Sequence, residues 1–371
     1  MTDVELVTGP GTVGRLGELV GWFAPRRVLV VATPAAVGRF DLADLLHGYE
    51  VRYFGGFTPN PQLDDALSGA RLAEGWDPEI VVGVGGGSTL DTAKLVRSLP
   101  VYRDRALAVL AGQIPPERRA PLVLVPTTAG TGSEVTSFAT VYVDRDKRSL
   151  DHPTVRAELA LVDPDLLTGC PPGVALSAAL DVVAHAVEST WAVRSTCESR
   201  ALAADALAAL VPALRKGEWP WSAGRREEVS TAATRAGLAV DRTRTTAGHA
   251  FAHPLTVRLG IPHGLACALN LVWLLPLSAR LLYGECQDPR GPAFVARRLD
   301  ELAVLLGGEP GPAVADLITA CGFSPWLTDH GVRAEEVPGL VYSALRAGRA
   351  ANGPVRLTAD AVVPWLGAHI C

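Results

Sequence analysis

The sequence predicts two domains, an α/β dinucleotide-binding domain followed by an all-helical domain. The first 163 residues alternate short β-branched runs with helical stretches, whereas the remainder is rich in alanine and leucine and has few strand-like runs. Such alternation is typical of a parallel sheet covered by helices. The 371 residues are enough for two domains with sizeable cores. We therefore expect an α/β domain over residues 1–163 and a helical domain over 164–371.

The strands of the first domain are predicted from apolar runs, several of them bounded by glycine or proline. Strands buried on both faces read as continuous apolar runs, which suits a parallel sheet. Helical patterns lie between them at 62–75 and 88–98. The four runs are R-V-L-V-V-A-T (27–33), I-V-V-G-V (80–84), L-V-L-V-P (122–126) and A-L-V-D (160–163).

The second domain is predicted to consist of helices joined by short loops. Its most apolar run, Leu265–Leu282, contains Pro276 and Arg280, so we expect a core helix and no membrane span. Residues 284–292 are expected to form a surface loop. The predicted helices are 174–192, 196–214, 226–240, 263–282, 293–306 and 333–348.

The bulk composition narrows the classes of partner and compartment. The net charge of −5 does not favour binding to nucleic acid or to an anionic membrane. The six cysteines form no C-x-x-C pair, which favours reduced thiols in a cytoplasmic protein. The N-terminus M-T-D-V-E-L-V has no basic start and no apolar core, so no signal peptide is expected.

Two segments that follow predicted strands have the composition of phosphate-binding loops. Glycines between a strand and a helix let backbone N–H groups approach a phosphate at the helix N-terminus, although a tight turn without a ligand would look the same. No Walker motif is present, which disfavours phosphoryl transfer. The candidate residues are Gly85, Gly86, Gly87, Ser88 and Asp91 in G-G-G-S-T-L-D, and Thr127, Thr128 and Thr131 in P-T-T-A-G-T-G-S-E.

A metal site is predicted from the second domain. Asp181 and His185 are four residues apart and so lie on one face of a helix, a spacing that a capping or surface contact would also give. His249 and His263 lie on neighbouring helices, separated by the helix break Gly260–Pro262. Three imidazoles and one carboxylate suit Fe²⁺ or Zn²⁺.

Several of these motifs together resemble the iron-containing (group III) alcohol dehydrogenases, over nearly the whole chain. They are G-G-G-S-T-L-D-T-A-K, P-T-T-A-G-T-G-S-E-V-T, D-x-x-x-H-A-x-E and H-x-x-x-H-P followed by G-I-P-H-G. The resemblance implies a dehydroquinate synthase-like fold, a homodimer, and hydride transfer that depends on NADH or NADPH and one divalent ion, with Fe²⁺ expected. It implies metal ligation by Asp181, His185, His249 and His263, a place for His253 near nicotinamide and substrate, and a cofactor contact for Lys147.

The cofactor preference stays open between NADH and NADPH. The segment Ala32-Thr33-Pro34 follows the strand where the adenosine ribose is expected to bind, and it contains no acidic residue. A 2′-phosphate would therefore not be repelled.

Local segments also resemble a subgroup that interconverts phosphonoacetaldehyde and 2-hydroxyethylphosphonate. A phosphonate needs charge-assisted donors, and arginine supplies them best. We expect at least one of four arginines to reach it, with Arg244 the first choice. The segments are 147–153, 188–199 and 241–249, and the candidate arginines are Arg148, Arg194, Arg244 and Arg258.

Three alternatives remain. One is a general alcohol dehydrogenase acting on a small alcohol, diol or aldehyde. Another is a lyase of the dehydroquinate-synthase type, which the Asp-plus-three-His set disfavours because that class uses one Glu with two His. The third is a protein that binds metal or nucleotide without catalysis, which lack of turnover with any aldehyde would favour.

Overall fold

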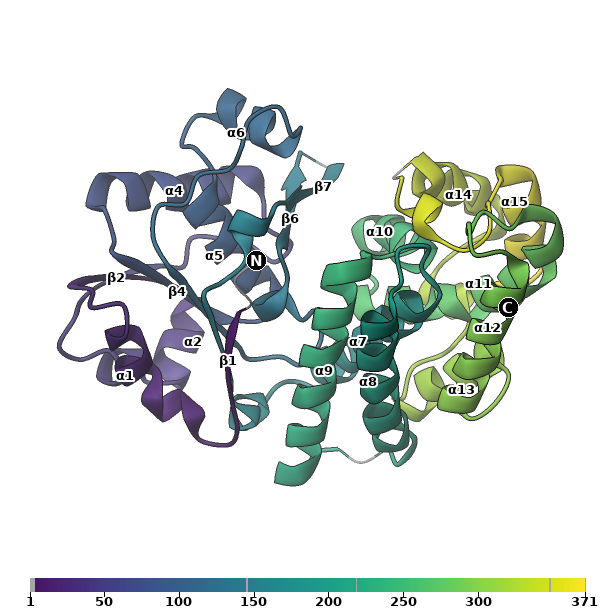
Figure 1. Ribbon diagram of the computed structural model, residues 1–371, viewed down its shortest axis with the longest axis horizontal. Helices are drawn as coiled ribbons and strands as arrows, with labels where there is room; N and C mark the ends of the chain where they lie inside the picture. The colour runs from purple at the N-terminus through teal and green to yellow at the C-terminus, as the bar shows by residue number, and fades with distance from the viewer. Residues whose placement is uncertain (1–3, 145, 218, 347, 371) are drawn as a thin grey trace. The chain divides into compact units, whose positions relative to one another are not determined.

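The computed structural model forms two compact units, which divide between Cys170 and Pro171. Figure 1 shows an α/β arrangement in the first unit and helices in the second. The described residues are 4–144, 146–217, 219–346 and 348–370.

The first unit contains a six-stranded parallel sheet with strand order β1-β8-β5-β4-β2-β3. All four predicted runs are strands of this sheet. A separate antiparallel hairpin, β6–β7, was not predicted. The strands are β1 (Glu5–Thr8), β2 (Arg27–Val31), β3 (Glu50–Phe54), β4 (Ile80–Gly85), β5 (Leu122–Pro126), β6 (Phe138–Val143), β7 (Asp146–Asp151) and β8 (Leu159–Val162).

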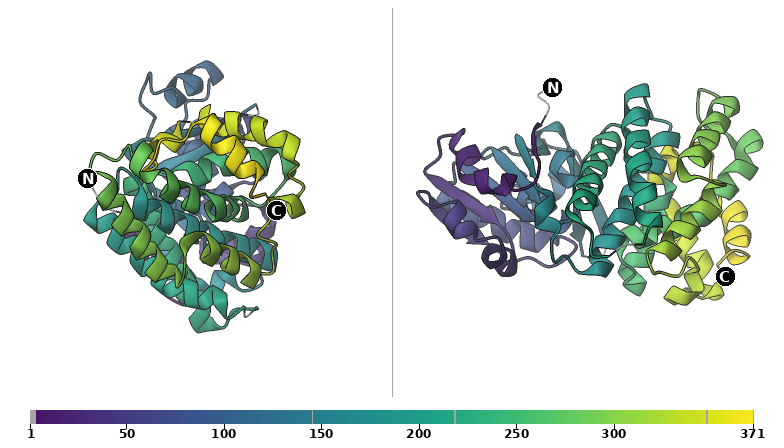
Figure 2. Two further views of the ribbon diagram at one scale, coloured as in Figure 1. Left: turned by 90° about the vertical axis from the view of Figure 1, so that its right-hand side faces the viewer. Right: turned by 90° about the horizontal axis from the view of Figure 1, so that it is seen from below.

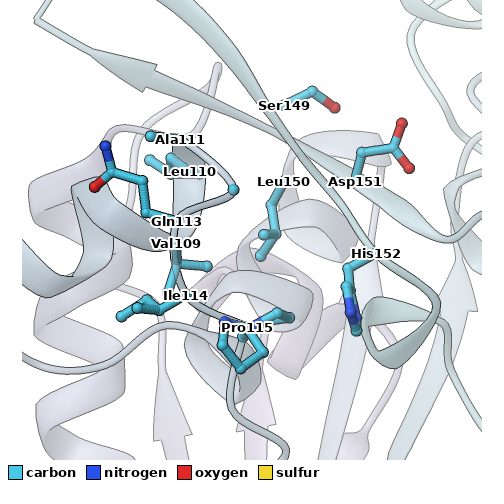
Figure 3. A pocket seen from close by; sticks show the side chains of 12 residues that line it. Val109, Leu110, Ala111, Gln113, Ile114, Pro115, Ser149, Leu150, Asp151 and His152 are labelled. Atoms are coloured by element: carbon cyan, nitrogen blue, oxygen red, sulfur yellow. The ribbon is translucent and has the colours of Figure 1, made fainter.

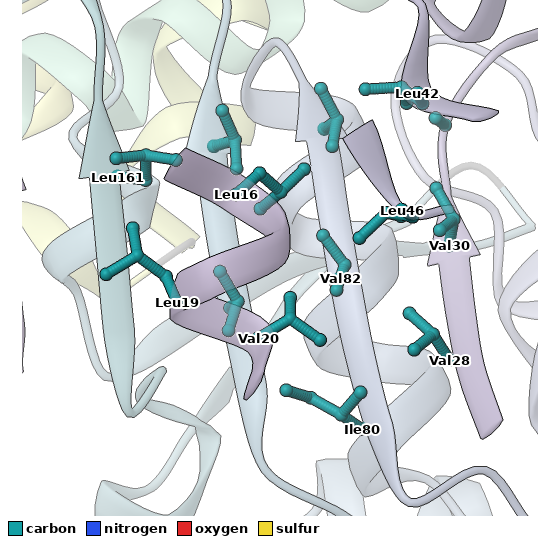
Figure 4. Packing of buried hydrophobic residues seen from close by; sticks show 14 of the residues in the cluster. Leu16, Leu19, Val20, Val28, Val30, Leu42, Leu46, Ile80, Val82 and Leu161 are labelled. Carbon is teal, nitrogen blue, oxygen red and sulfur yellow. The ribbon is translucent and has the colours of Figure 1, made fainter. Parts of the chain in front are cut away.

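Helices cover both faces of the sheet, as the alternation of strand residues requires. Val28 and Val30 of β2 pack with α1 and α3 on one face, where Figure 4 shows the interlocked side chains. Leu29 and Val31 pack on the other face with α4 and α5. Full burial of each such side chain contributes about 1.5–3 kcal/mol. The helices are α1 (Leu16–Gly21), α2 (Pro34–Arg39), α3 (Leu42–Leu45), α4 (Leu63–Trp76), α5 (Gly87–Ser98) and α6 (Arg103–Leu110).

The two strands of the six-stranded sheet that the sequence analysis missed, β1 and β3, lie at its edges. In β3 only Phe54 is buried, and none of the four residues of β1 is. An edge strand has fewer neighbours, so its residues need not be apolar. Apolar runs therefore predict edge strands poorly.

Among the described residues of the second unit, the regular elements are all helices, apart from an isolated bridge between Cys286 and Val355. α7 packs against α8, α9 and α11, and α10 packs against α11 and α14. Figure 2 shows the helices of this unit, coloured teal to yellow, from two further sides. The helices are α7 (Pro172–Trp191), α8 (Cys197–Arg215), α9 (Ala223–Thr243), α10 (Ala247–Leu259), α11 (His263–Glu285), α12 (Pro292–Leu306), α13 (Pro310–Ala320), α14 (Val337–Arg346) and α15 (Ala359–Gly367).

The predicted helix boundaries in this unit differ from the observed ones by up to four residues. α11 continues to Glu285, so the loop expected over 284–292 begins two residues later. The helix expected over 333–348 begins at Val337, after a single 3₁₀ turn, and Pro338 in its first turn suits that start. Residue 347 lies outside the described residues.

α11 is long and apolar enough to cross a membrane by length and composition alone. However, 72% of its most apolar window is buried inside the protein. That burial is the property of a core helix, as the interruptions of its apolar run predict.

Candidate active site

The glycine-rich turn lies where β4 ends and α5 begins. Gly85 has φ +159°, and Gly86 caps α5, whose first residue is Gly87. A side-chain carbon at Gly86 would lie 3.3 Å from Thr128 Oγ1. Gly86, Gly87 and Ser88 are half-buried. The first amides of α5 therefore stand at a helix N-terminus with only glycine and serine beside them, a geometry that suits a phosphate.

The threonine-rich loop lies beside this turn because β5 is the neighbour of β4. Pro126 stands opposite Gly85 in the register, and Thr127 N donates to Gly85 O at 2.9 Å. A side-chain carbon at Gly87 would lie 2.5 Å from Thr131 Cγ2. The sheet thus brings the two predicted loops into contact at the carboxyl ends of adjacent strands, where nucleotides bind in open α/β sheets.

The Asp91 carboxylate is engaged by the protein itself. It accepts from Ser133 Oγ at 2.6 Å and from Thr140 N at 2.8 Å. Burial raises the pKa of this carboxyl, and the charges of Lys94 and Lys147 act in the opposite direction. Asp91 therefore ties the threonine-rich loop and strand β6 to α5, and Lys147 lies near enough to influence it.

Three of the four predicted metal ligands, Asp181, His249 and His263, have donor atoms within 4.8 Å of one another, and the fourth, His185, stacks on His249. Asp181 and His185 lie on α7, His249 lies on α10, and His263 is the first residue of α11. Asp181 Oδ1 is 3.4 Å from His249 Nε2. The His249 ring stacks on the His185 ring with centroids 4.6 Å apart, and its centroid is 5.5 Å from that of His263. Three helices therefore converge on one point.

Two glycines let the helices approach so closely. A side-chain carbon at Gly264 would lie 2.0 Å from the backbone oxygen of Ser177 and 2.7 Å from Asp181 Cβ. A side-chain carbon at Gly248 would lie 2.8 Å from Glu188 Oε1. Each glycine is next to a predicted ligand, so the G-H and H-G pairs place the imidazoles against α7.

Glu188 fixes the orientation of His249. Its Oε2 contacts His249 Nδ1, and its Oε1 accepts from Thr246 Oγ1 at 2.6 Å. Trp191 Nε1 donates in turn to Thr246 Oγ1 at 3.2 Å. Because Nδ1 faces a carboxylate, the lone pair of Nε2 is directed at the convergence point, the arrangement that metal-binding histidines use.

The electrostatics of the site favour a cation. Burial alone would raise the pKa of the Asp181 carboxyl, but the imidazoles of His185 and His249 hold it well below its usual range. Burial alone would lower the pKa of His249, but Cys267 and Glu188 raise it well above its usual value. The buried charge of Asp181 is thus available to balance a metal cation.

The residues present fit a divalent transition metal. Among the described residues, Asp181 Oδ1 and His249 Nε2 are buried atoms with no hydrogen-bond partner. Leaving such atoms unsatisfied costs about 1–3 kcal/mol each, and a metal ion would satisfy both. One carboxylate with several imidazoles is a donor set that Fe²⁺ and Zn²⁺ accept.

Sequence reasoning missed two residues of this cluster, Glu188 and Cys267. Glu188 is seven residues after Asp181 and therefore on the same face of α7. Cys267 follows His263 by four residues, and its Sγ is 3.8 Å from His263 Nε2. Helical spacing from a predicted ligand would have identified both.

The candidate arginines differ in exposure and in position. Arg148 and Arg194 are exposed, and Arg258 is exposed nine residues beyond His249 on α10, about 13 Å along the helix. Arg244 is half-buried after α9, where its Nη1 contacts Asp241, and its backbone has φ 62° and ψ 167°. His253 is also half-buried, one turn after His249.

A further arginine, absent from the sequence-based candidates, lies at the turn that contains Arg244. Arg349 Nη1 donates to Thr245 Oγ1 at 3.1 Å. Asn352 Nδ2 donates to the carbonyl oxygens of Thr243, Arg244 and Thr245 at 2.9–3.3 Å. No pattern in the sequence connects residues 349–352 with residues 243–245, so only the fold could reveal this contact.

A separate hollow of about 540 Å³ lies in the first unit (Figure 3). Residues 109–116 and 149–152 line it, and none of the predicted site residues is among them. Its lining does not include the glycine-rich turn or the threonine-rich loop.

Two family models together match almost the whole chain. The model of iron-containing alcohol dehydrogenases matches residues 4–164. The model of the C-terminal domain of the Fe-containing alcohol dehydrogenase family matches residues 175–370.

Individual relatives include reductases of small aldehydes. The chain is 35% identical to phosphonoacetaldehyde reductase of Streptomyces viridochromogenes, over 98% of this chain and 89% of that protein. It is 27% identical to lactaldehyde reductase of Escherichia coli, over 96% and 95%. The crystal structure of sulfoacetaldehyde reductase from Bifidobacterium kashiwanohense with NAD⁺ is similar with a TM-score of 0.85 and 26% identity, over 100% of this chain and 98% of that one.

Proposed function

The chain belongs to the iron-containing alcohol dehydrogenase family and is an NAD(P)-dependent alcohol dehydrogenase or aldehyde reductase, and on that premise we propose that it reduces phosphonoacetaldehyde to 2-hydroxyethylphosphonate. The main observation that supports this substrate is the 35% identity to a phosphonoacetaldehyde reductase over 98% of the chain. The sulfoacetaldehyde reductase neighbour supports it, because its substrate also joins a strongly acidic group to an aldehyde through one carbon.

The metal would be held by Asp181, His185, His249 and His263. When bound, a divalent ion supplies Lewis acidity, which polarises the aldehyde carbonyl and lowers the barrier to hydride transfer by several kcal/mol. Glu188 keeps His249 in the tautomer that leaves Nε2 available.

The cofactor would be held by the loops of the first unit. The amides of Gly86, Gly87 and Ser88 bind the pyrophosphate, and Thr127, Thr128 and Thr131 contact the ribose or nicotinamide side. Two observations support this assignment of the cofactor site: the helix N-terminus at α5 and the contact between the two loops. NADH or NADPH supplies the hydride.

His253 would deliver the proton to the nascent alkoxide, directly or through water and a ribose hydroxyl. It is half-buried and lies one helical turn from His249. Replacing it with alanine should lower kcat by about 10²-fold and change the pH profile of kcat. Wild-type pH dependence in that variant would leave His253 as a packing residue.

The phosphonate would be recognised at the turn between α9 and α10. Arg244 belongs to this turn, and Arg349 contacts it through Thr245. Two guanidinium groups at one turn match a dianionic group. The turn is joined to the metal cluster, because the next residue, Thr246, donates to Glu188.

The test compares kcat/KM for phosphonoacetaldehyde, sulfoacetaldehyde and propionaldehyde. Charged hydrogen bonds contribute roughly 1.5–3 kcal/mol each, so phosphonoacetaldehyde should exceed propionaldehyde by about 10²-fold or more. Arg244→Ala should reduce that preference and leave propionaldehyde turnover unchanged, with the exposed Arg258→Ala as the control. A higher kcat/KM for sulfoacetaldehyde would assign the anion site to a sulfonate substrate.

The second candidate is a general reductase of small aldehydes. The 27% identity to lactaldehyde reductase, over 96% of the chain, favours it. Equal efficiency on phosphonoacetaldehyde and propionaldehyde in the wild-type protein would establish this candidate in place of the first.

The protein is also proposed to be a cytoplasmic homodimer. The five cysteines in the described residues are free thiols, which supports a reducing compartment. Sedimentation equilibrium tests the dimer, and a monomer mass of 39.0 kDa would contradict it.

A further inference from the structure

One sulfur atom lies within the donor cluster of the second unit. The donor atoms of Asp181, His249, His263 and Cys267 are all within 4.8 Å of one another. Cys267 is fully buried, and its Sγ is 3.8 Å from His263 Nε2. The cluster therefore offers a soft donor as well as oxygen and nitrogen.

We propose that Cys267 is a sulfur ligand of the divalent metal in this chain and shifts the metal preference of the site towards thiophilic ions. The inference rests on the metal site proposed above and adds a donor to it. On coordination the thiol releases its proton to solvent and the sulfur binds as thiolate.

The donor atoms lie close enough together for one ion. With bonds of about 2.0–2.1 Å to nitrogen and 2.3 Å to sulfur, the ligands of one tetrahedral ion lie roughly 3.3–3.6 Å apart. The four donor atoms lie within 4.8 Å of one another, so they approach one ion with shifts of about 1 Å or less. The 3.8 Å between Cys267 Sγ and His263 Nε2 is already a ligand-to-ligand separation.

The geometry of α11 places Cys267 beside His263. His263 and Cys267 are four residues apart, so their side chains lie on one face of the helix. That face is held against α7 by Gly264, whose missing side chain allows contact with Ser177 and Asp181. The packing that brings His263 to Asp181 therefore brings Cys267 as well.

A sulfur donor changes the metal selectivity expected of the site. Thiolates select zinc and other soft ions, whereas carboxylate and water ligands suit Mn²⁺ and Mg²⁺. A site with Asp, His and Cys donors should discriminate strongly between Cd²⁺ and Mn²⁺. An Asp-and-His site without the sulfur should discriminate less.

The experiment loads metal-free protein with Co²⁺ and records the absorption spectrum together with the bound metal content. The wild-type protein should bind one Co²⁺ and show a thiolate-to-cobalt charge-transfer band in the near ultraviolet. Cys267→Ser should keep the bound Co²⁺ and lose the band. Cys321→Ser is the matched control, because Cys321 is a buried cysteine of the same unit outside the cluster, and it should keep both.

A competition titration gives the second readout. Cys267→Ser should lose about 10- to 100-fold in Cd²⁺ affinity, at least the loss seen when a supporting residue of a metal site is removed, with Mn²⁺ affinity nearly unchanged. Circular dichroism and thermal unfolding check that both serine variants fold. Where Cys267→Ser fails to fold, the wild-type spectrum alone decides.

The outcomes separate the two proposals. Bound Co²⁺ without a charge-transfer band in the wild-type protein overturns the role of Cys267 and leaves the metal site standing. No bound Co²⁺ overturns the metal site and the sulfur ligand together. A band that survives in Cys267→Ser also overturns the assignment.

Discussion

The glycine-rich turn of the first unit and the group of candidate metal ligands in the second both depend on glycine, but in different ways. At Gly87 an added side-chain carbon would meet the side chain of Thr131, whereas at Gly264 it would meet the backbone of α7. The first glycine keeps a helix N-terminus open beside a loop, and the second sets the spacing of two helices. A side chain can rotate away more easily than a backbone can move, so an added side chain should be tolerated less at Gly264 than at Gly87.

The largest effect is expected from removing a metal ligand. His263→Ala should lower kcat by 10³-fold or more, on the order of the several kcal/mol that a Lewis acid supplies. Nucleotide binding, measured by quenching of protein fluorescence, should stay nearly unchanged because its loops lie in the other unit. Full activity of this variant in the presence of a chelator would disprove the metal-dependent mechanism.

Gly264→Ala tests the helix spacing. The new carbon would lie 2.0 Å from Ser177 O, so α11 must move away from α7. We expect a loss of about 1–3 kcal/mol in the free energy of unfolding and weaker Co²⁺ binding, measured by denaturant titration and metal competition. The control is Gly284→Ala on the same helix, where nothing lies within 4 Å of the added carbon. Equal metal affinity in both variants would show that Gly264 does not position the ligands.

Gly86→Val tests the glycine-rich turn. The side chain would occupy the space through which a phosphate approaches the amides, so the cofactor KM should rise. Loss of one charged hydrogen bond costs roughly 1.5–3 kcal/mol, or about 10- to 150-fold. Metal content should not change, and steady-state kinetics with NADH and NADPH provide the measurement. Unchanged kinetics with both cofactors would exclude the turn as the pyrophosphate site.

The smallest effect is expected in the preference between NADPH and NADH. After β2, Thr33 caps α2 and Pro34 begins it, without an acidic residue to repel a 2′-phosphate. We expect the two kcat/KM values to differ by less than about tenfold, a free-energy difference below about 1.4 kcal/mol. A larger preference for NADH would mean that another group excludes the phosphate.

The two regions also differ in how far the sequence predicts them. The glycine-rich turn and the threonine-rich loop are contiguous motifs that follow apolar runs, so their positions at adjacent strand ends follow from the order of the sheet. The candidate metal ligands were predicted as a set, but Cys267 was left out of it although it follows His263 by four residues on α11. Arg349 is about a hundred residues away from Thr245 in the chain, and no local pattern connects them. Strands β1 and β3 were missed because edge positions do not demand apolar residues.

The backbone at Arg244 has a consequence for how this protein can change over generations. Its φ of 62° and ψ of 167° belong to a region that glycine adopts easily and that costs other residues about 1–3 kcal/mol. A mutation to glycine would therefore increase stability and be favoured by selection for stability alone, but it would remove the guanidinium group. Lineages that need the cation must retain a destabilising residue at this turn, whereas lineages that reduce neutral aldehydes are free to lose it. On the proposed role of Arg244 in binding the phosphonate, the identity of residue 244 among relatives is expected to follow the substrate that was under selection.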